Sequence, residues 1–145
     1  MAKSKELFND DSSGFEFVKE ILEGDPTCAI NFDRLQKQPQ KGYIIFEYLL
    51  CEEEQKVNPH TSHPNRYWHK NAQKFISLFQ VSRDLPGILV LVNYAKKGTK
   101  HENKVKVIVV KDIDKAKGIT DSKETDMTKD KFKVWFRKLN KESCQ

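Results

Sequence analysis

The segment GILVLVNYA at residues 87–95 constrains the possible folds of this chain more than any other stretch. Its unbroken aliphatic run is typical of a strand at the centre of a sheet, because both faces of such a strand are covered. The run is far shorter than the ~20 apolar residues that a membrane-spanning helix needs, so it does not predict a membrane protein. We therefore expect a buried central strand with helices packed on the sheet.

Two strands and a helix are predicted before this central strand. The segments TCAINFDRL (27–35) and GYIIFEYLL (42–50) are rich in Ile, Phe and Tyr and are separated by turn-forming residues, which predicts an antiparallel hairpin. A helix is predicted from Asn65 to about Asp84, because its apolar residues share one face: Trp68, Ala72, Phe75, Ile76 and Phe79. A helix that connects two strands of one sheet makes them parallel, with a right-handed connection.

Each end of the chain predicts a further helix. Residues 13–24 begin with the capping-box spacing of Ser13 and Glu16, and Gly24 ends the helix. Near the C-terminus, Thr128 caps a helix whose apolar residues repeat with helical spacing, namely Phe132, Trp135, Phe136 and Leu139.

A fourth strand is predicted at residues 104–114, KVKVIVVKDID, which pairs with residues 87–95 as a hairpin. The expected fold is α/β of mixed α+β type, with the order α-β-β-α-β-β-α and a four-stranded mixed sheet in one domain of residues 1–145. Residues 1–11 are expected to be flexible, and residues 115–127 to form a mobile loop. The N-terminal segment lacks the apolar core of a signal peptide, which favours a cytoplasmic location.

The positive charge of the chain is concentrated near one end. The formal net charge is +5, and residues 96–117 alone hold eight lysines against three acids. Such a basic region favours an anionic partner, and nucleic acid is the commonest one for a cytoplasmic protein. We favour DNA, and a protein partner with an acidic surface stays open as an alternative.

Two acids of the predicted hairpin form the candidate reactive site. If the turn is centred near Pro39 and Gln40, Asp33 and Glu47 face each other on the same side of the sheet. A hard ion such as Mg²⁺ is bound through one or two carboxylates together with substrate phosphates, so this pair is a candidate metal site. Glu47 is also out of place in an apolar strand. The alternatives are that Glu47 sits on a half-exposed face, or that it pairs with a cation of the hairpin, Arg34 or Lys41.

The order of these elements resembles the core of the PD-(D/E)XK nuclease superfamily. An acidic first helix with Glu16, then Asp33 and Glu47 on successive strands, then a crossover helix and a buried parallel strand, are similar to that restriction-endonuclease-like core over residues 13–95. The resemblance implies Mg²⁺- or Mn²⁺-dependent hydrolysis of nucleic-acid phosphodiesters by a metal-activated water. It makes Asp33 and Glu47 the metal ligands, with Glu16 as a further catalytic residue. The superfamily's lysine, two residues after the glutamate, is Leu49 here, and two strands precede the crossover helix where the family usually has three.

The polar side of the predicted crossover helix is basic. Lys70 and Lys74 lie opposite its apolar face, so we expect them to point to solvent and away from Glu47. Together with Arg66 they suit contacts with phosphates. His63 stands at the helix start, where backbone N–H groups and the helix dipole favour an anion. An ordinary solvated helix face explains the lysines equally well.

Two alternatives to a nuclease follow from other residues. A zinc site would use Cys51, His60, His63 and His69, but their spacing matches no closed zinc site. The main alternative function is a non-enzymatic basic module that binds nucleic acid or protein through the crossover helix and the lysine-rich hairpin at residues 95–106.

Overall fold

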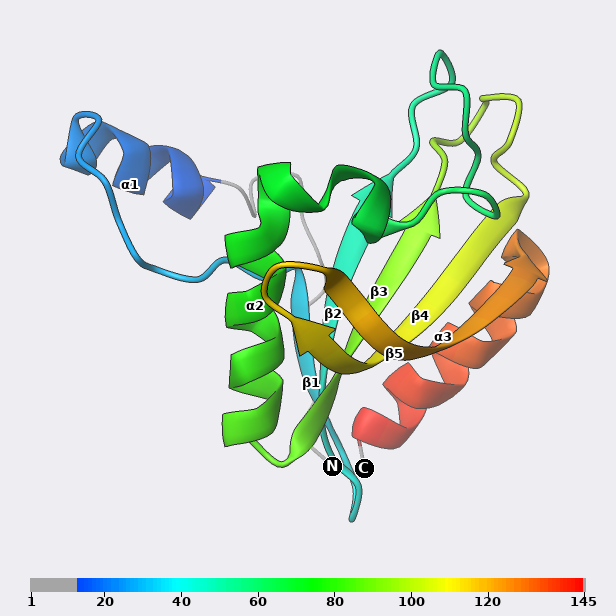
Figure 1. The fold of residues 1–145 in the computed structure, drawn as a ribbon. Coiled ribbons are helices and arrows are strands. Elements are labelled where there is room, and N and C mark those ends of the chain that lie inside the picture. Colours follow the sequence, from blue (N-terminus) through cyan, green and yellow to red (C-terminus); the bar gives the residue numbers. More distant parts are fainter. Residues whose placement is uncertain (1–12, 145) are drawn as a thin grey trace.

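The computed structural model describes residues 13–144 and shows one five-stranded mixed sheet with the strand order β1-β2-β3-β4-β5 (Figure 1). The elements in chain order are α1 (Ser13–Leu22), β1 (Arg34–Gln38), β2 (Gly42–Leu50), the 3-10 helix η1 (Pro64–Tyr67), α2 (Trp68–Asp84), β3 (Gly87–Tyr94), β4 (Lys104–Asp114), β5 (Gly118–Thr128) and α3 (Lys129–Ser143). Strands β2 and β3 are parallel, and all other neighbours are antiparallel. The expected flexibility of residues 1–11 lies outside the described residues. None of the helices within residues 13–144 has the length and apolar character needed to cross a membrane.

Strand β3 is the buried centre of the sheet, as its aliphatic sequence predicts. Its residues from Leu89 to Asn93 are all buried, because α2 covers one face of the sheet and α3 covers the other (Figure 1). On the α2 side the core consists mainly of Ile45, Trp68, Phe75, Leu78, Leu89, Leu91 and Ile108. On the α3 side it consists of Ile44, Phe46, Val90, Val92, Val105 and Val107, packed against the apolar residues of α3. Each large apolar side chain that is fully buried stabilises the fold by about 1.5–3 kcal/mol.

Helix α3 follows its predicted pattern closely. The Thr128 side chain accepts a hydrogen bond from the Lys131 backbone N–H at 3.2 Å and so caps the helix. Phe136 lies edge-on to Phe46, with ring centroids 5.3 Å apart. These contacts hold α3 on the sheet, where it lies close to β1, β4 and β5, although the helix contains no fully buried residue.

The predicted mobile loop at residues 115–127 is wrong, because most of this segment is strand β5. It pairs with β4 from Lys104 opposite Thr128 to Asp114 opposite Gly118, with a bulge after Val110. The sheet therefore has five strands, one more than predicted. The strand escaped prediction because it is polar on both sides, and hydrophobic periodicity is the main sequence signal for a strand.

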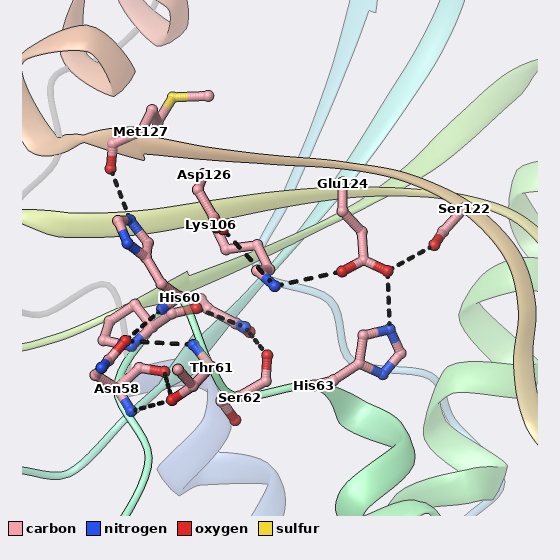
Figure 2. Close-up of polar contacts among 12 residues, drawn as sticks. Asn58, His60, Thr61, Ser62, His63, Lys106, Ser122, Glu124, Asp126 and Met127 are labelled. Carbon is pink, nitrogen blue, oxygen red and sulfur yellow. Dashed lines mark hydrogen bonds and ion pairs between the residues drawn. The ribbon is translucent and has the colours of Figure 1, made fainter.

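The loop before η1 holds β3 and β5 together. The buried Asn93 side chain donates hydrogen bonds to the backbone oxygens of Pro59 (3.2 Å) and Ser62 (2.8 Å), which explains the one polar side chain in the buried part of β3. From the same loop, His60 lies with its Nε2 atom 3.1 Å from the Met127 backbone oxygen (Figure 2). The loop thus fixes the end of β5 relative to the centre of the sheet.

A cluster of charged side chains continues this contact along β5 (Figure 2). Glu124 lies with its carboxylate 3.4 Å from His63 Nε2 and 3.4 Å from Lys106 Nζ, and it accepts a hydrogen bond from Ser122 Oγ at 3.0 Å. Lys106 also lies 3.7 Å from Asp126. Polar contacts therefore hold a strand that offers little apolar surface.

Asn65 and Trp68 secure the other end of β5. The Asn65 amide donates to the Ile119 backbone oxygen at 2.9 Å and accepts from the Ile119 N–H at 2.8 Å, so it imitates a neighbouring strand. Trp68 donates from its ring nitrogen to the Lys115 backbone oxygen at 3.0 Å. Gly118 allows this close approach, because a Cβ atom there would lie 2.3 Å from Asn65 Oδ1.

Strand β1 is shorter than the strand predicted at residues 27–35. The hairpin of β1 and β2 is confirmed, but β1 begins at Arg34 and residues 27–33 form no ladder.

Helix α1 forms where predicted, and Gly24 follows it with a φ of 91°. It contains no buried residue, and its apolar side chains, such as Ile21, are exposed. Figure 1 shows α1 set apart from the sheet.

We predict that Asn65→Ala destabilises the protein by about 1–3 kcal/mol, because the N–H and C=O groups of Ile119 lose their partners. Urea unfolding measures this loss, with Asn71→Ala on the exposed side of α2 as the matched control. The control should change stability by less than about 0.5 kcal/mol. Equal stability of the two variants would refute the anchoring role of Asn65.

Candidate active site

The hairpin brings Asp33 and Glu47 together. Arg34 pairs with Phe46, so continuing the register by one residue places Asp33 opposite Glu47. Asp33 Oδ2 accepts a hydrogen bond from the Tyr48 backbone N–H at 2.8 Å and thereby takes the place of a strand carbonyl just beyond the end of β1. The predicted register of the hairpin is thus confirmed as far as Arg34 and Phe46, and a shared metal site of Asp33 and Glu47 stays a prediction.

Glu47 is a buried carboxylate with one oxygen unpaired. Its side chain is only 3% exposed, and Oε1 forms an ion pair with Lys74. Its other oxygen, Oε2, is buried and has no hydrogen-bond partner among the described residues. Burial raises the pKa of the Glu47 carboxyl, and the Asp33 carboxylate adds to this shift. The Lys74 ammonium and, to a smaller extent, the backbone N–H of Asp33 lower the pKa.

The expected orientation of Lys74 is wrong. Its side chain is 45% exposed, but its ammonium turns inward to Glu47. The buried side of α2 is wider than the predicted apolar face, because Leu78 and Ser82 also lie on it. Leu78 follows Lys74 by one helical turn, so Lys74 lies at the boundary between the buried and exposed sides. From this boundary its long aliphatic stem carries the charge to the sheet.

Neither hairpin cation that was considered as a partner of Glu47 pairs with it among the described residues. The Arg34 guanidinium donates to Gln36 Oε1 at 2.7 Å, forms a second hydrogen bond with Asn140, and lies over the Phe136 ring. It therefore belongs to the contact between β1 and α3. No ion pair between Glu47 and Lys41 forms among residues 13–144.

Two clefts lie along α2; Lys74 lines the first, and the side chains of Asp33 and Glu47 line neither. The first, of about 460 Å³, is enclosed by residues 27–31 and by Gln73, Lys74 and Ser77. The second, of about 380 Å³, lies at the end of β2 and is lined by Arg66 and Lys70 among others. The predicted phosphate-binding residues Arg66, Lys70 and Lys74 thus line clefts on the side of the sheet to which Glu47 points.

Two predicted site residues lie apart from these acids. Glu16 is 67% exposed on α1 and pairs with Lys19 at 3.6 Å. His63 accepts a hydrogen bond from the Asn65 N–H at its Nδ1 atom and faces Glu124 with Nε2, so its ring is engaged in the start of η1 and in β5. Helix capping and strand anchoring explain His63 without a phosphate. Within residues 13–144 no group of three or more His, Cys, Asp or Glu side chains is placed to hold a metal ion, so the described site contains two acids and not three.

Comparison with known proteins gives no guide to this site. No protein-family model, curated protein or solved structure matches the chain. What the chain does must therefore follow from the chemistry of its own residues. The sequence analysis did not predict that Lys74 pairs with Glu47. Leu78, which is buried one turn further along the same side of α2, is the residue that could have indicated it.

We predict that Lys74→Met destabilises the protein by about 1–3 kcal/mol, because the buried Glu47 carboxylate loses its counter-charge. The half-exposed position of Lys74 keeps the loss below that of a fully buried pair. The double variant Glu47→Gln/Lys74→Met should be more stable than Lys74→Met alone. A double-mutant cycle of urea unfolding measures this, and purely additive effects would show that the two side chains are not coupled.

The Glu47 carboxyl also predicts a pH dependence. Because its folded-state pKa is raised above 4.5, its contribution to stability is complete below pH 4.5 and is lost as the pH rises through the folded pKa. Glu47→Gln removes this contribution, so the free energy of unfolding of the wild type should fall relative to that of the variant over this range. Unfolding series at several pH values test this, and parallel curves would contradict it.

His63 predicts a pH dependence of opposite sign. Burial lowers the pKa of His63 below 6.5, and Lys106 also lowers it, although Glu124 opposes the shift. Stability from the neutral ring is present above pH 6.5 and is lost as the pH falls through the folded pKa. His63→Asn keeps an acceptor for the Asn65 N–H but does not titrate. Between about pH 7.5 and pH 5, the melting temperature of the variant should therefore fall less than that of the wild type. An equal fall in both proteins would show that the titration of His63 does not contribute to this loss of stability.

Proposed function

We propose that this chain is a metal-dependent phosphodiesterase that acts on nucleic acid. The observation that carries the proposal is the buried Oε2 atom of Glu47, which has no hydrogen-bond partner among the described residues. Glu47 lies just beyond the last pair of the β1–β2 ladder, where Asp33 binds the neighbouring Tyr48 N–H. Buried polar atoms are almost always paired, so an unpaired carboxylate oxygen beside a second acid indicates a cationic ligand. Kinship with the PD-(D/E)XK superfamily and its restriction-endonuclease-like core is part of this proposal.

The two acids suit Mg²⁺ or Mn²⁺. Asp33 uses one oxygen for the Tyr48 N–H, and Glu47 uses one for Lys74, so each keeps one oxygen for a metal. Two carboxylate oxygens together with substrate phosphate are a usual environment for Mg²⁺. When bound, the ion supplies positive charge at the scissile phosphate and lowers the pKa of an attacking water.

Lys74 can take the role of the superfamily's motif lysine, whose position is occupied here by Leu49. The superfamily's lysine follows its glutamate by two positions on the same strand, whereas here an ammonium group reaches Glu47 from α2. Glu47 holds this ammonium at the edge of the cleft that residues 27–31 form with α2. There it can orient a scissile phosphate and stabilise the negative charge that develops on it.

Arg66 and Lys70 extend this positive side of the molecule. Both line the neighbouring cleft at the end of β2, and they precede Lys74 at intervals of one helical turn. Contacts of this kind bind phosphates without reading base sequence, and they make affinity fall as salt rises. We favour DNA as the substrate.

The same contacts also support a second function. Lys74 already neutralises Glu47, and Asp33 already binds the Tyr48 N–H, so both acids have a structural use. A non-enzymatic module would then bind nucleic acid or an acidic protein through α2 and the lysine-rich turn between β3 and β4. Dependence on a divalent metal separates the two functions.

A cleavage assay with Mg²⁺ or Mn²⁺ on plasmid and on single-stranded DNA tests the proposal. We predict cleavage by the wild type and a loss of at least about 100-fold in Glu47→Gln, Asp33→Asn and Lys74→Met. Asp84→Asn, an exposed acid at the far end of α2, is the matched control and should keep full activity. Mn²⁺ should also raise the melting temperature of the wild type but not that of Glu47→Gln.

The outcomes distinguish the two functions. Wild-type protein that cleaves neither substrate with either ion, and whose melting temperature responds to Mn²⁺ no more than that of Glu47→Gln, overturns the phosphodiesterase. DNA binding that persists in such an experiment and weakens with salt supports the binding module.

A further inference from the structure

A third cleft lies on the other face of the sheet. It has a volume of about 520 Å³, within the range of small-molecule sites, and lies between the ends of β2 and β3, the turn that follows β3, and the start of α3. Its floor includes the buried side chains of Val92 and Val105. The side chains that form the proposed phosphodiesterase site do not line it.

Aromatic rings form the walls of this cleft. Tyr48, Tyr94 and Phe132 line it from β2, β3 and α3. Phe132 stacks on Phe136 with ring centroids 5.4 Å apart, and Tyr48 stacks on Phe46 at 6.3 Å. The walls are therefore supported from behind, as suits a site that stacks against a flat ring.

Lysines surround the opening. Lys96, Lys97 and Lys129 all line the cleft. Lys129 pairs with Glu102 at 3.4 Å and Lys96 with Glu52 at 4.0 Å, whereas Lys97 has no carboxylate partner in the described part of the chain. An apolar, aromatic interior with a cationic rim fits a flat ring that carries an anionic group, which is the chemistry of a nucleobase with its phosphate.

Tyr48 connects this cleft to the two acids. Its side chain lines the cleft, its backbone N–H donates to Asp33, and the preceding residue, Glu47, points to the opposite face. The ladder of β1 and β2 stops at the pair of Arg34 and Phe46, so among residues 13–144 no strand covers the edge of β2 beyond that point, where the Asp33 side chain accepts from the Tyr48 N–H. A polymer can pass around this open edge from one face to the other.

Tyr94 lies near this edge as well, because it pairs with Leu50, two residues beyond Tyr48, in the ladder of β2 and β3. Burial raises the pKa of its hydroxyl, and the carboxylates of Asp33 and Glu52 raise it further. A phosphate at the acids and a base in the cleft can therefore belong to one short stretch of a nucleic-acid strand.

We infer that this cleft binds one unpaired nucleobase, so that the nucleic acid is single-stranded where it meets the protein. This inference rests on the nucleic-acid part of the proposed function and adds its substrate class. A paired base must leave its duplex before it can enter the cleft, and unpairing costs a few kcal/mol. Single strands avoid this cost and should bind more tightly than duplexes of the same sequence.

Fluorescence anisotropy tests this with a labelled single-stranded oligonucleotide and its duplex, in EDTA so that no cleavage occurs. We expect the wild type to prefer the single strand, and Tyr94→Leu to weaken single-strand binding about five- to 150-fold, as for the loss of one base–aromatic stack. Tyr94→Phe should retain binding, because it keeps the ring. Tyr43→Leu, at the opposite end of β2, is the matched control and should bind as the wild type does.

The cationic rim has its own matched pair of variants. Lys97→Gln should weaken single-strand binding, whereas Lys111→Gln, an exposed lysine in the second half of β4, should not. Melting temperatures of all variants show that they are folded. Equal affinity for both oligonucleotides, or unchanged single-strand affinity in a folded Tyr94→Leu, overturns the base-binding cleft.

The result is distinguishable from failure of the proposed function. Cleavage that needs Glu47, together with binding that ignores Tyr94, refutes the base-binding cleft and leaves the phosphodiesterase in place. Single-strand binding that needs Tyr94, without cleavage by any metal, supports the cleft in a protein that only binds.

Discussion

A carboxylate buried inside an apolar strand is the constraint on which the rest of the structure depends. Glu47 lies in β2, next to the central strand, and its side chain is almost completely withdrawn from water. A buried charge is strongly unfavourable unless it is paired. Lys74 provides the pairing from α2, which ties the position of the helix to one residue of the sheet. The fold thus stabilises an acid that the hydrophobic effect alone would exclude from this strand.

The start of α2 links this acid to the far edge of the sheet. The segment that leads into the helix holds β5 through His60, Asn65 and Trp68. The same segment therefore fixes the first turn of α2, and Lys74 follows in the next turns of the same rigid helix. The contacts with β5, the outermost strand, thus help to set the position of the Lys74 ammonium at the proposed site. Side chains that suggest reactive chemistry in the sequence act here as structural anchors.

The sequence predicted those parts of the fold in which burial and periodicity agree. Strand β3 and helices α2 and α3 have strong apolar patterns, and the structure confirms them. Strand β5 lacks such a pattern, since hydrogen bonds to side chains from a distant segment hold it in place. For the site, the register of the hairpin followed from the sequence, and it leaves Asp33 and Glu47 next to the last pair of the ladder. The inward turn of Lys74 did not, because a boundary residue of a helix can point either way until its neighbours are placed.

The alternation of side chains along a strand allows β2 to serve both faces of the sheet. Glu47 points toward α2 and Tyr48 toward α3, since successive residues of a strand face opposite sides. A polymer can contact both side chains only where no neighbouring strand covers the edge of β2. In residues 13–144, no strand pairs with this edge beyond Phe46. In the proposed function, the acid that would hold the metal and the ring that would stack on a base lie one residue apart. Strand β1 begins at Arg34, later than the sequence predicts, and this late start leaves the edge of β2 at Glu47 and Tyr48 without a paired strand among the described residues.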